Sequence, residues 1–313
     1  MKPLSFAFIA AAGVLTLALA QKLANPFLGR WDITVTGPRG TYPDWMQLTE
    51  KDGGLDAFIQ PRGGSAFHTT QVKLEGSHLE ITLAHPTPRN PNPRNAPTWD
   101  LTAEGNRFTG TMKQGNSTSK LEGVRAPKLD RPMPKAWGKP EPIFNGKDLT
   151  GWEPASTTPN HWVVQNGELI NESKGANLRT TRTFNDFKLH IEYNCPEHGN
   201  SGVYLRGRYE IQVEYEPLDF NDEYHRMGAI YSFLKPAVEL PRKPGAWESY
   251  DATLVGRRLT LYRDGVKIID NPEIPGSTGG AMDSHEAEPG PILIQGDHTG
   301  GMKYRNITVA LPK

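Results

Sequence analysis

Residues 201–214 read SGVYLRGRYEIQVE, with apolar and polar side chains alternating on both sides of a turn at Gly207-Arg208-Tyr209. Alternation with a period of two is typical of β-strands, because successive side chains point to opposite faces of a sheet. The stretch therefore predicts a hairpin whose valine, leucine and isoleucine side chains share one face. A three-residue loop containing glycine would pair Arg206 with Glu210 and Tyr204 with Gln212 on the opposite, polar face.

This polar face has more than one interpretation. A solvated sheet face with a cross-strand Arg–Glu pair is common, whereas tyrosine and glutamine among the charges favour a sugar-binding groove. Glu210 and Glu214 also lie on one strand face, as the carboxylates of sandwich-fold glycosidases do in an E-x-D-x-E strand. Their Cα atoms would be roughly 13 Å apart. A retaining mechanism needs carboxyl groups about 5–5.5 Å apart, and Gln212 stands in place of the aspartate.

A second polar cluster is Gln295-Gly-Asp-His298, which follows the apolar strand Pro291-Ile-Leu-Ile294. A strand end followed by glycine is a natural place for side chains that face a site. His298 is a candidate acid–base group or metal ligand because its charge changes near neutral pH. The alternative is a plain turn in which Asp297 caps its own backbone.

The rest of the chain also predicts β-structure. The 313 residues include 32 glycines and 27 prolines, which favours short strands and many turns. Residues 28–125 predict eight strands of a small antiparallel barrel or sandwich, faintly lipocalin-like. Residues 126–142 carry five prolines and predict a semi-rigid linker. Residues 143–313 predict ten further strands of a two-sheet jelly-roll sandwich, with Asn166-Gly167 and Asp264-Gly265 as hairpin turns.

The charge balance and the N-terminal residues indicate which class of partner the protein lacks and where it is located. Lys and Arg number 35, as do Asp and Glu, which argues against a dedicated nucleic-acid binder. Residues 1–20 have one lysine, a short apolar run and an Ala-Leu-Ala ending, so a signal peptide cut after Ala20 is expected rather than a membrane anchor. The expected location is therefore the periplasm or the medium. Cys195 is the single cysteine and is expected to be a small buried residue rather than a catalytic thiol.

Residues 143–310 resemble the bacterial family of 3-keto-disaccharide hydrolases, which have the fold of concanavalin A-like lectins and glucanases. The most specific matching stretch is GNSGVYLRGRYEIQV at 199–213. The others are IFNGKDLTGW at 143–152, FNDFKL at 184–189, GAIY at 228–231, GAWESYD at 245–251, PGPILIQGDH at 289–298 and YRNI at 304–307. The residues Glu214-Tyr215-Glu216 and the loop 216–227 depart from the family, and the N-terminal part lies outside the resemblance.

The resemblance implies cleavage of a sugar whose 3-hydroxyl has been oxidised to a ketone. The ketone acidifies the C2 hydrogen, so a base can remove it and the C1 substituent can leave by elimination or hydrolysis. The implied roles are Glu210 as base and His298 as helper of the leaving oxygen, with Arg206 or a divalent cation such as Ca²⁺ or Mn²⁺ polarising the ketone. The implied substrate contacts are Tyr204, Gln212, Gln295, Asp297, Asn200 and Trp162.

Two other functions remain open from the sequence. One is an ordinary retaining glycoside hydrolase that uses Glu210 and Glu214. The other is a non-catalytic carbohydrate-binding module, because a fold does not fix a function. The sugar, the aglycone, the metal dependence and the oligomeric state are left open.

Overall fold

The computed structural model describes residues 25–38, 40–85, 95–217 and 222–313, and the regular elements of these residues are all β-strands. This confirms the all-β prediction. None of the described residues belongs to a helix with the length and apolar character needed to cross a bilayer. The expected signal peptide, residues 1–20, lies outside the described residues.

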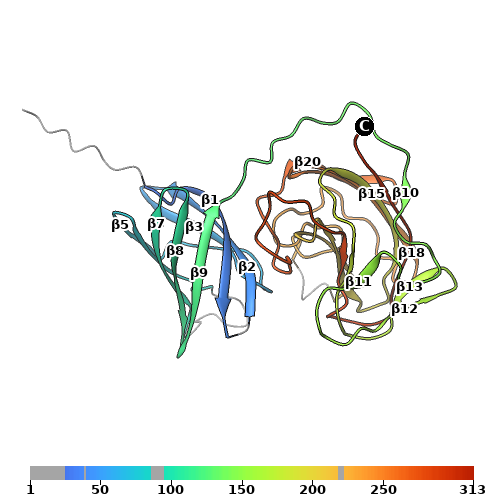
Figure 1. Cartoon of the computed structure of the whole chain (residues 1–313), viewed down its shortest axis with the longest axis horizontal. Coiled ribbons are helices and arrows are strands. Elements are labelled where there is room, and N and C mark those ends of the chain that lie inside the picture. The colour runs from blue at the N-terminus through green and yellow to red at the C-terminus, as the bar shows by residue number, and fades with distance from the viewer. Residues whose placement is uncertain (1–24, 39, 86–94, 218–221) are drawn as a thin grey trace, which may run out of the picture.

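The N-terminal half is a nine-stranded antiparallel sheet that curls into a small barrel (Figure 1). Its strands are β1 Gly29–Gly37, β2 Gly40–Lys51, β3 Gly54–Gln60, β4 Phe67–Thr69, β5 Val72–Glu75, β6 His78–Thr82, β7 Thr98–Glu104, β8 Arg107–Gln114 and β9 Ser117–Arg125. The sheet runs β4-β3-β2-β1-β9-β8-β7-β6-β5, so its two edge strands are consecutive in the sequence. The Thr69 hydroxyl of the edge strand β4 donates to the Thr82 carbonyl of β6 at 3.1 Å, which links one edge to the strand beside the other edge.

The barrel interior is filled by apolar side chains rather than left as a lumen. Trp31, Trp99 and Phe108 are at most 1% exposed, and Trp31 and Phe108 lie 5.0 Å apart between ring centroids. The inward-facing apolar residue at every second position of each strand supplies this core, as the alternation predicts. The predicted strand 67–74 is split into β4 and β5, because residues 70 and 71 turn the edge of the barrel.

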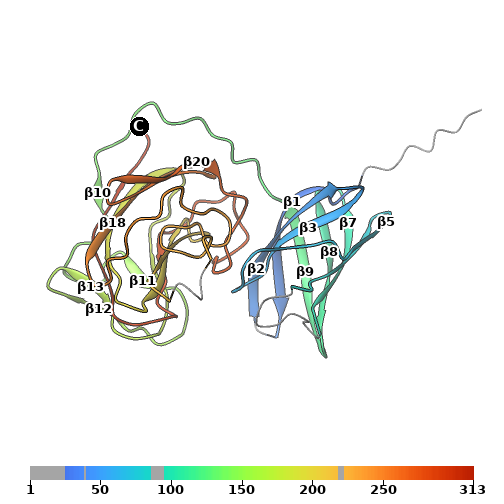
Figure 2. The same cartoon turned by 180° about the vertical axis from the view of Figure 1, so that it is seen from behind.

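The proline-rich segment between the two halves is an extended chain. Residues 126–140 contain no strand and run along the outside of the second half to β10, Glu141–Pro142 (Figures 1 and 2). The segment is tied down on the way: Arg131 pairs with Asp186 at 2.9 Å, and the Lys188 ammonium lies 5.3 Å from the centre of the Trp137 ring.

The C-terminal half is a jelly-roll sandwich of two antiparallel sheets. The larger sheet contains β12 Trp162–Gln165, β13 Glu168–Asn171, β22 Met302–Ala310, β15 Phe187–Asn194, β18 Trp247–Val255, β19 Arg258–Arg263 and β20 Val266–Glu273 in this spatial order, with β10 beside β22. The smaller sheet contains β11 Trp152–Pro154, β14 Leu178–Thr180, β21 Leu293–Ile294, β16 Asn200–Leu205 and β17 Tyr209–Glu214. Apolar residues of both inner faces form one core, and Cys195 belongs to it with 1% exposure.

The barrel and the sandwich share a tightly packed contact. Trp45 of β2 belongs to the hydrophobic core of the sandwich, and its ring centroid lies 5.5 Å from that of Phe233. A Cβ atom added to Gly276 would lie 2.2 Å from the Trp45 indole nitrogen, so only glycine allows this approach. The Gly63 amide also donates to the Gly279 carbonyl at 2.7 Å. This contact places a barrel loop beside the β16–β17 hairpin, which matters for the site.

Candidate active site

The β16–β17 hairpin forms as predicted, but with another register. Tyr204 pairs with Glu210 and Gly202 with Gln212. The loop comprises residues 206–208 and begins one position earlier than expected, because Arg206 adopts a left-handed backbone with φ of +53°. Because the loop begins one position earlier, each residue of β17 pairs with a β16 residue that lies two positions earlier than predicted. The predicted pairing of Arg206 with Glu210 is therefore wrong.

Arg206 lies in a buried network away from Glu210. Its Nη2 donates to the Tyr209 hydroxyl at 2.7 Å and to the Gly256 carbonyl at 3.2 Å. The Tyr209 hydroxyl in turn donates to Glu286 Oε1 at 2.7 Å. Arg206 is fully buried and does not line the cavity described next, so the expected contact with a substrate ketone is not supported.

Most of the other predicted residues meet at one cavity of about 240 Å³ on the outer face of the smaller sheet, called here the central cavity. Strands β16 and β17, the segment after β21 and several loops supply its walls. The predicted residues on its lining are Asn200, Tyr204, Glu210, Gln212, Gln295, Asp297 and His298. The two separate sequence clusters, the hairpin and residues 295–298, are thus brought together.

Glu210 is the buried acid of the central cavity. Its side chain lies across Gly202 of the neighbouring strand, where an added Cβ would meet Glu210 Oε1 at 2.3 Å. Burial raises the pKa of Glu210 to about 7, against the opposing effects of the Tyr204 hydroxyl bond and the charge of His298. A carboxyl group with a pKa near neutrality can both take up and return a proton under physiological conditions.

Asp297 and His298 form a pair at the more exposed side of the cavity. Their Oδ1 and Nδ1 atoms are 2.8 Å apart, and about half of each side chain is exposed. The hydrogen bond to Asp297 raises the pKa of His298, and the charges of Asp297 and Glu210 act in the same direction. The predicted alternative, in which Asp297 only caps a turn, does not account for this pairing.

Two side-chain oxygens in the cavity wall accept no hydrogen bond within the described structure. They are Gln212 Oε1 and Gln295 Oε1, and both are buried. The Gln295 Nε2 group donates to the Tyr204 hydroxyl at 3.3 Å. Buried acceptors without a donor are costly, and the hydroxyl groups of a sugar are donors of the required kind.

Trp162 does not contact the cavity. It is 3% exposed, and its indole nitrogen donates to the Ala176 carbonyl at 2.8 Å. A Cβ on Gly296 would lie 2.8 Å from that nitrogen, so the Trp162 ring packs against the backbone of the turn that precedes Asp297. The expected stacking of Trp162 on a sugar ring is therefore not supported.

Glu214 lies apart from Glu210. Its two carboxylate oxygens accept hydrogen bonds from the Glu216 amide at 2.6 Å and the Met227 amide at 3.1 Å. Glu214 lines a different cavity, of about 280 Å³, together with Tyr215 and Arg242. The structure therefore does not bring together the carboxylate pair that the retaining-glycosidase hypothesis requires.

Several lining residues are absent from the sequence prediction. They are Arg62, Gly63, Asn177, Glu216, His225, Tyr231 and the glycine-rich segment 279–281. Arg62 and Gly63 come from the barrel, and His225 bonds Ser65 of the barrel at 2.8 Å through Nε2 and Asp222 at 2.7 Å through Nδ1. No sequence signal could find the barrel residues, because nothing local shows which barrel loop meets the sandwich.

The described residues offer little to a metal ion. Within this part of the chain no three histidine, cysteine, aspartate or glutamate side chains gather as metal ligands. Residues 218–221, beside Asp222, lie outside the described structure. Among the described residues, the central cavity therefore has no cluster of three such side chains for the divalent cation that the resemblance suggested.

Similarity to known proteins agrees with the resemblance seen in the sequence. Residues 139–310, more than half of the chain, match the family model described as a 3-keto-alpha-glucoside-1,2-lyase-like domain. No curated protein of similar sequence is found.

Solved structures cover somewhat more than half of the chain. A candidate glycosyl hydrolase from Parabacteroides distasonis is 27% identical with a TM-score of 0.47, covering 57% of this chain and 92% of its own. Another from the same organism is 22% identical with a TM-score of 0.42, covering 55% and 98%. The carbohydrate-binding module CBM66 from Bacillus subtilis is 14% identical with a TM-score of 0.33, covering 51% and 94%. By its family match, the chain belongs to the 3-keto-alpha-glucoside-1,2-lyase-like domain family.

Proposed function

We propose that the protein is an exported enzyme that cleaves glycosides of 3-keto sugars between C1 and the leaving group. The observation that carries the proposal is the buried Glu210 carboxyl group, with a pKa of about 7, in the wall of a small polar cavity. A base of this strength suits the removal of a hydrogen next to a ketone. The family match supports the same substrate class.

The reaction divides into two proton transfers. Glu210 takes the C2 proton, and the C2–H electrons form an enolate with the C3 ketone. The enolate electrons then move to form a C1–C2 double bond as the bond from C1 to the leaving oxygen breaks. His298 gives its proton to that oxygen, since its raised pKa favours the protonated form. Addition of water at C1 and return of the proton to C2 would complete a net hydrolysis.

The remaining cavity residues are assigned to binding and orientation. Burial keeps the pKa of the Tyr204 hydroxyl well above its usual value, so it stays a hydrogen-bond donor beside Glu210. The unpartnered oxygens of Gln212 and Gln295 accept sugar hydroxyls, and their amide nitrogens are donors for the ketone oxygen that Arg206 does not reach. Asp297 orients the His298 ring through Nδ1.

The decisive experiment compares a 3-keto-glucoside with its unoxidised parent under the same conditions, with and without EDTA. Release of the leaving group from the keto compound alone supports the proposal. Release from both compounds would indicate an ordinary glycosidase. Binding of both without turnover would indicate a carbohydrate-binding module, the second function that the sequence leaves open.

Export is part of the proposal and has its own test. The protein is expected to lose residues 1–20 during transport across the inner membrane. The mass of the protein from the periplasm or medium of its bacterial host should correspond to a chain that begins at Gln21. A full-length chain that stays with the cytoplasm would contradict export without affecting the proposed chemistry.

A further inference from the structure

A second, larger cavity of about 790 Å³ adjoins the central cavity and is called here the junction groove. The two cavities share Arg62, Asn177, Gly280, Ala281 and Asp297 as common wall. The other walls come from both halves of the molecule, including Thr41, Tyr42 and Pro43 from the barrel and Lys174 and Arg179 from the sandwich. A ligand in the central cavity can therefore extend past Asp297 between barrel and sandwich.

The barrel side of the groove is held in place rather than loosely apposed. The Arg62 backbone amide donates to Asp44 Oδ1 at 2.7 Å, and the next residue, Gly63, donates to the Gly279 carbonyl at 2.7 Å. A Cβ on Gly279 would meet the Gly64 carbonyl oxygen at 2.6 Å, so the two backbones are in contact. The position of the Arg62 backbone relative to the central cavity is thus set by the fold.

The groove carries an excess of positive charge. Its lining includes Arg62, Lys174 and Arg179 against the single carboxylate of Asp297, which already pairs with His298. Arg179 pairs with Glu153 at 2.8 Å, whereas Arg62 and Lys174 form no ion pair within the described residues. The Arg62 guanidinium lies over the Tyr42 ring at 5.0 Å from its centre, which orients it beside the groove.

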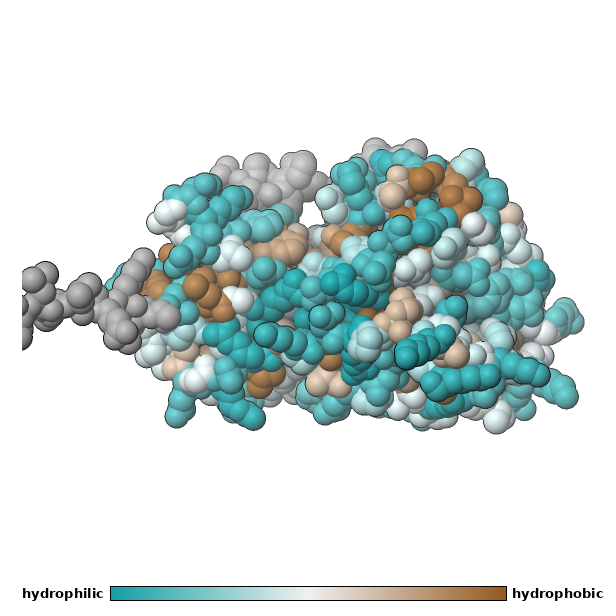
Figure 3. All heavy atoms as spheres, turned by 90° about the horizontal axis from the view of Figure 1, so that it is seen from above, coloured by the Kyte–Doolittle hydropathy of each residue, from teal (hydrophilic) through white to brown (hydrophobic). Residues whose placement is uncertain are grey.

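We propose that the junction groove binds the leaving group of the glycoside, and that Arg62 and Lys174 select leaving groups that carry an anionic group such as a carboxylate. The inference rests on the proposed function for the direction of the substrate. C1 must lie near His298, so the leaving group extends from the shared wall at Asp297 into the groove. The barrel would then determine which glycosides the sandwich cleaves. Seen from above, the surface of the molecule is mostly hydrophilic (Figure 3).

The test measures binding first, so that it does not depend on turnover. Calorimetry on the full chain compares three unoxidised glucosides: 4-carboxyphenyl, its neutral methyl ester and 4-sulfophenyl. We expect the carboxylate compound to bind about tenfold more tightly than the ester at low salt, equivalent to about 1.4 kcal/mol. The difference should shrink as salt is added, because the cations are exposed. The sulfonate arm shows whether any anion suffices or a carboxylate is required.

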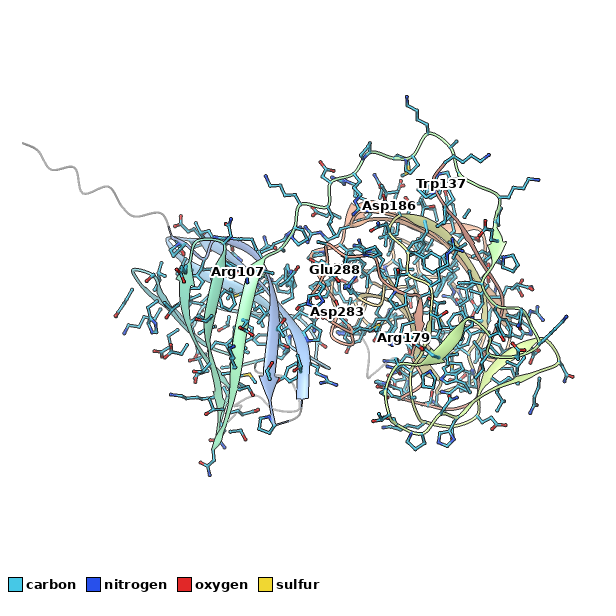
Figure 4. The ribbon with its side chains drawn as sticks, viewed as in Figure 1. Arg107, Trp137, Arg179, Asp186, Asp283 and Glu288 are labelled. Carbon is cyan, nitrogen blue, oxygen red and sulfur yellow. The ribbon has the colours of Figure 1, made fainter. Side chains whose placement is uncertain are left out.

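Matched variants assign the effect to residues. Lys174→Gln should reduce the preference for the acid while leaving the affinity for the ester within twofold, and Arg62→Gln, whose side chain also lines the central cavity, should reduce the same preference. Arg107, exposed on the barrel and labelled in Figure 4, provides the control Arg107→Gln, which should keep the full preference. Equal affinity for acid and ester, no binding of the acid at millimolar concentration, or an unchanged preference in both variants would overturn the inference.

The 3-keto forms of the same compounds then separate this inference from the proposed function. Turnover of the acid and the ester with equal kcat/KM would leave the proposed function standing and contradict the selectivity. Selective binding of the acid without turnover of any 3-keto form would leave the groove standing and contradict the proposed chemistry.

Discussion

At the scale of single residues, Glu210 and Gly202 depend on each other. Glu210 lies over the neighbouring strand only because Gly202 has no side chain there. The same burial that this placement produces raises the pKa of Glu210. An acid that titrates near pH 7 is therefore a consequence of one glycine on the adjacent strand.

Glu210→Gln tests the base directly. The amide cannot take a proton, so kcat on a 3-keto-glucoside should fall by about 10²–10⁴-fold. For the unaltered protein, the base must be ionised, so kcat/KM should decrease about tenfold per pH unit below the pKa of about 7. Stopped-time assays between pH 5 and 8 would show both effects, and full activity of the variant would remove Glu210 from the mechanism.

Gly202→Ala tests the positioning of Glu210. The new Cβ would lie 2.3 Å from Glu210 Oε1 and 2.8 Å from its Cγ, so the carboxylate must move. We expect kcat to fall by at least about tenfold, because a displacement of about 1 Å can cost 10²-fold, with a smaller change in KM. Gly54→Ala is the control, since its Cβ would meet only the Lys51 carbonyl at 3.8 Å. Equal activity of both variants would contradict this dependence.

At the scale of elements, the 206–208 loop determines which polar residues share the cavity. The loop starts at Arg206, so Tyr204 rather than Arg206 stands opposite Glu210. Arg206 instead fills the space next to Tyr209 and the Gly256 carbonyl. Its Nε and Nη1 atoms have no partner within the described residues, but Arg206 does not line the central cavity, so it belongs to a buried network rather than to a ligand contact.

Arg206→Lys distinguishes these two roles. A lysine keeps the charge but loses the planar fork of hydrogen bonds, so the free energy of unfolding should fall by about 1–3 kcal/mol. The kcat of the folded variant should stay within a few-fold of the original value. Urea unfolding followed by activity assays would check this. A 100-fold loss of kcat at unchanged stability would return Arg206 to the catalytic site.

At the scale of the whole molecule, the barrel and sandwich are joined by polar groups as well as by Trp45. Asp32 of β1 is 2% exposed and lies beside Glu286 of the sandwich, which Arg257 contacts at 3.1 Å. Burial, and then the neighbouring Glu286 carboxylate, raises the pKa of Asp32. A protonated Asp32 can donate to Glu286, so one proton helps to hold the two halves together.

Asp32→Asn tests this shared proton. The folded protein holds the proton to a higher pH than the unfolded chain, whose aspartates titrate near pH 3.9, so stability should fall as pH rises above about 4. The loss can reach about 1.4 kcal/mol per pH unit for one group. An asparagine donates without titrating, so the variant should lose less stability between pH 5 and 8 than the original protein. Urea midpoints at the two pH values measure this.

The control for that comparison is Asp52→Asn, an exposed turn residue with φ of +52° that asparagine tolerates. It should keep the original pH dependence. A pH dependence in Asp32→Asn that equals that of the control would contradict the shared proton.

Much of the fold follows from the sequence because it rests on local rules. Alternation gives the strands of both halves, and Asn166-Gly167 and Asp264-Gly265 form the predicted turns with positive φ at all four residues. The short strands β11 and β14 were not predicted, since three residues are too few for alternation to show. The hairpin loop was misplaced by one residue, because Arg206 carries no local signal for a left-handed backbone.

The sequence by itself determined that this is an all-β protein of this family and that segments 201–214 and 295–298 carry the polar side chains of the candidate site. The tertiary structure alone decided which of those groups share a cavity: it includes Glu210 and His298, leaves out Arg206 and Trp162, and adds Arg62 from the barrel. The physical reason is the distance along the chain over which each kind of interaction acts. Strand periodicity and turn chemistry act over a few residues, whereas the cavity arises where two sheets and a distant loop are packed against each other.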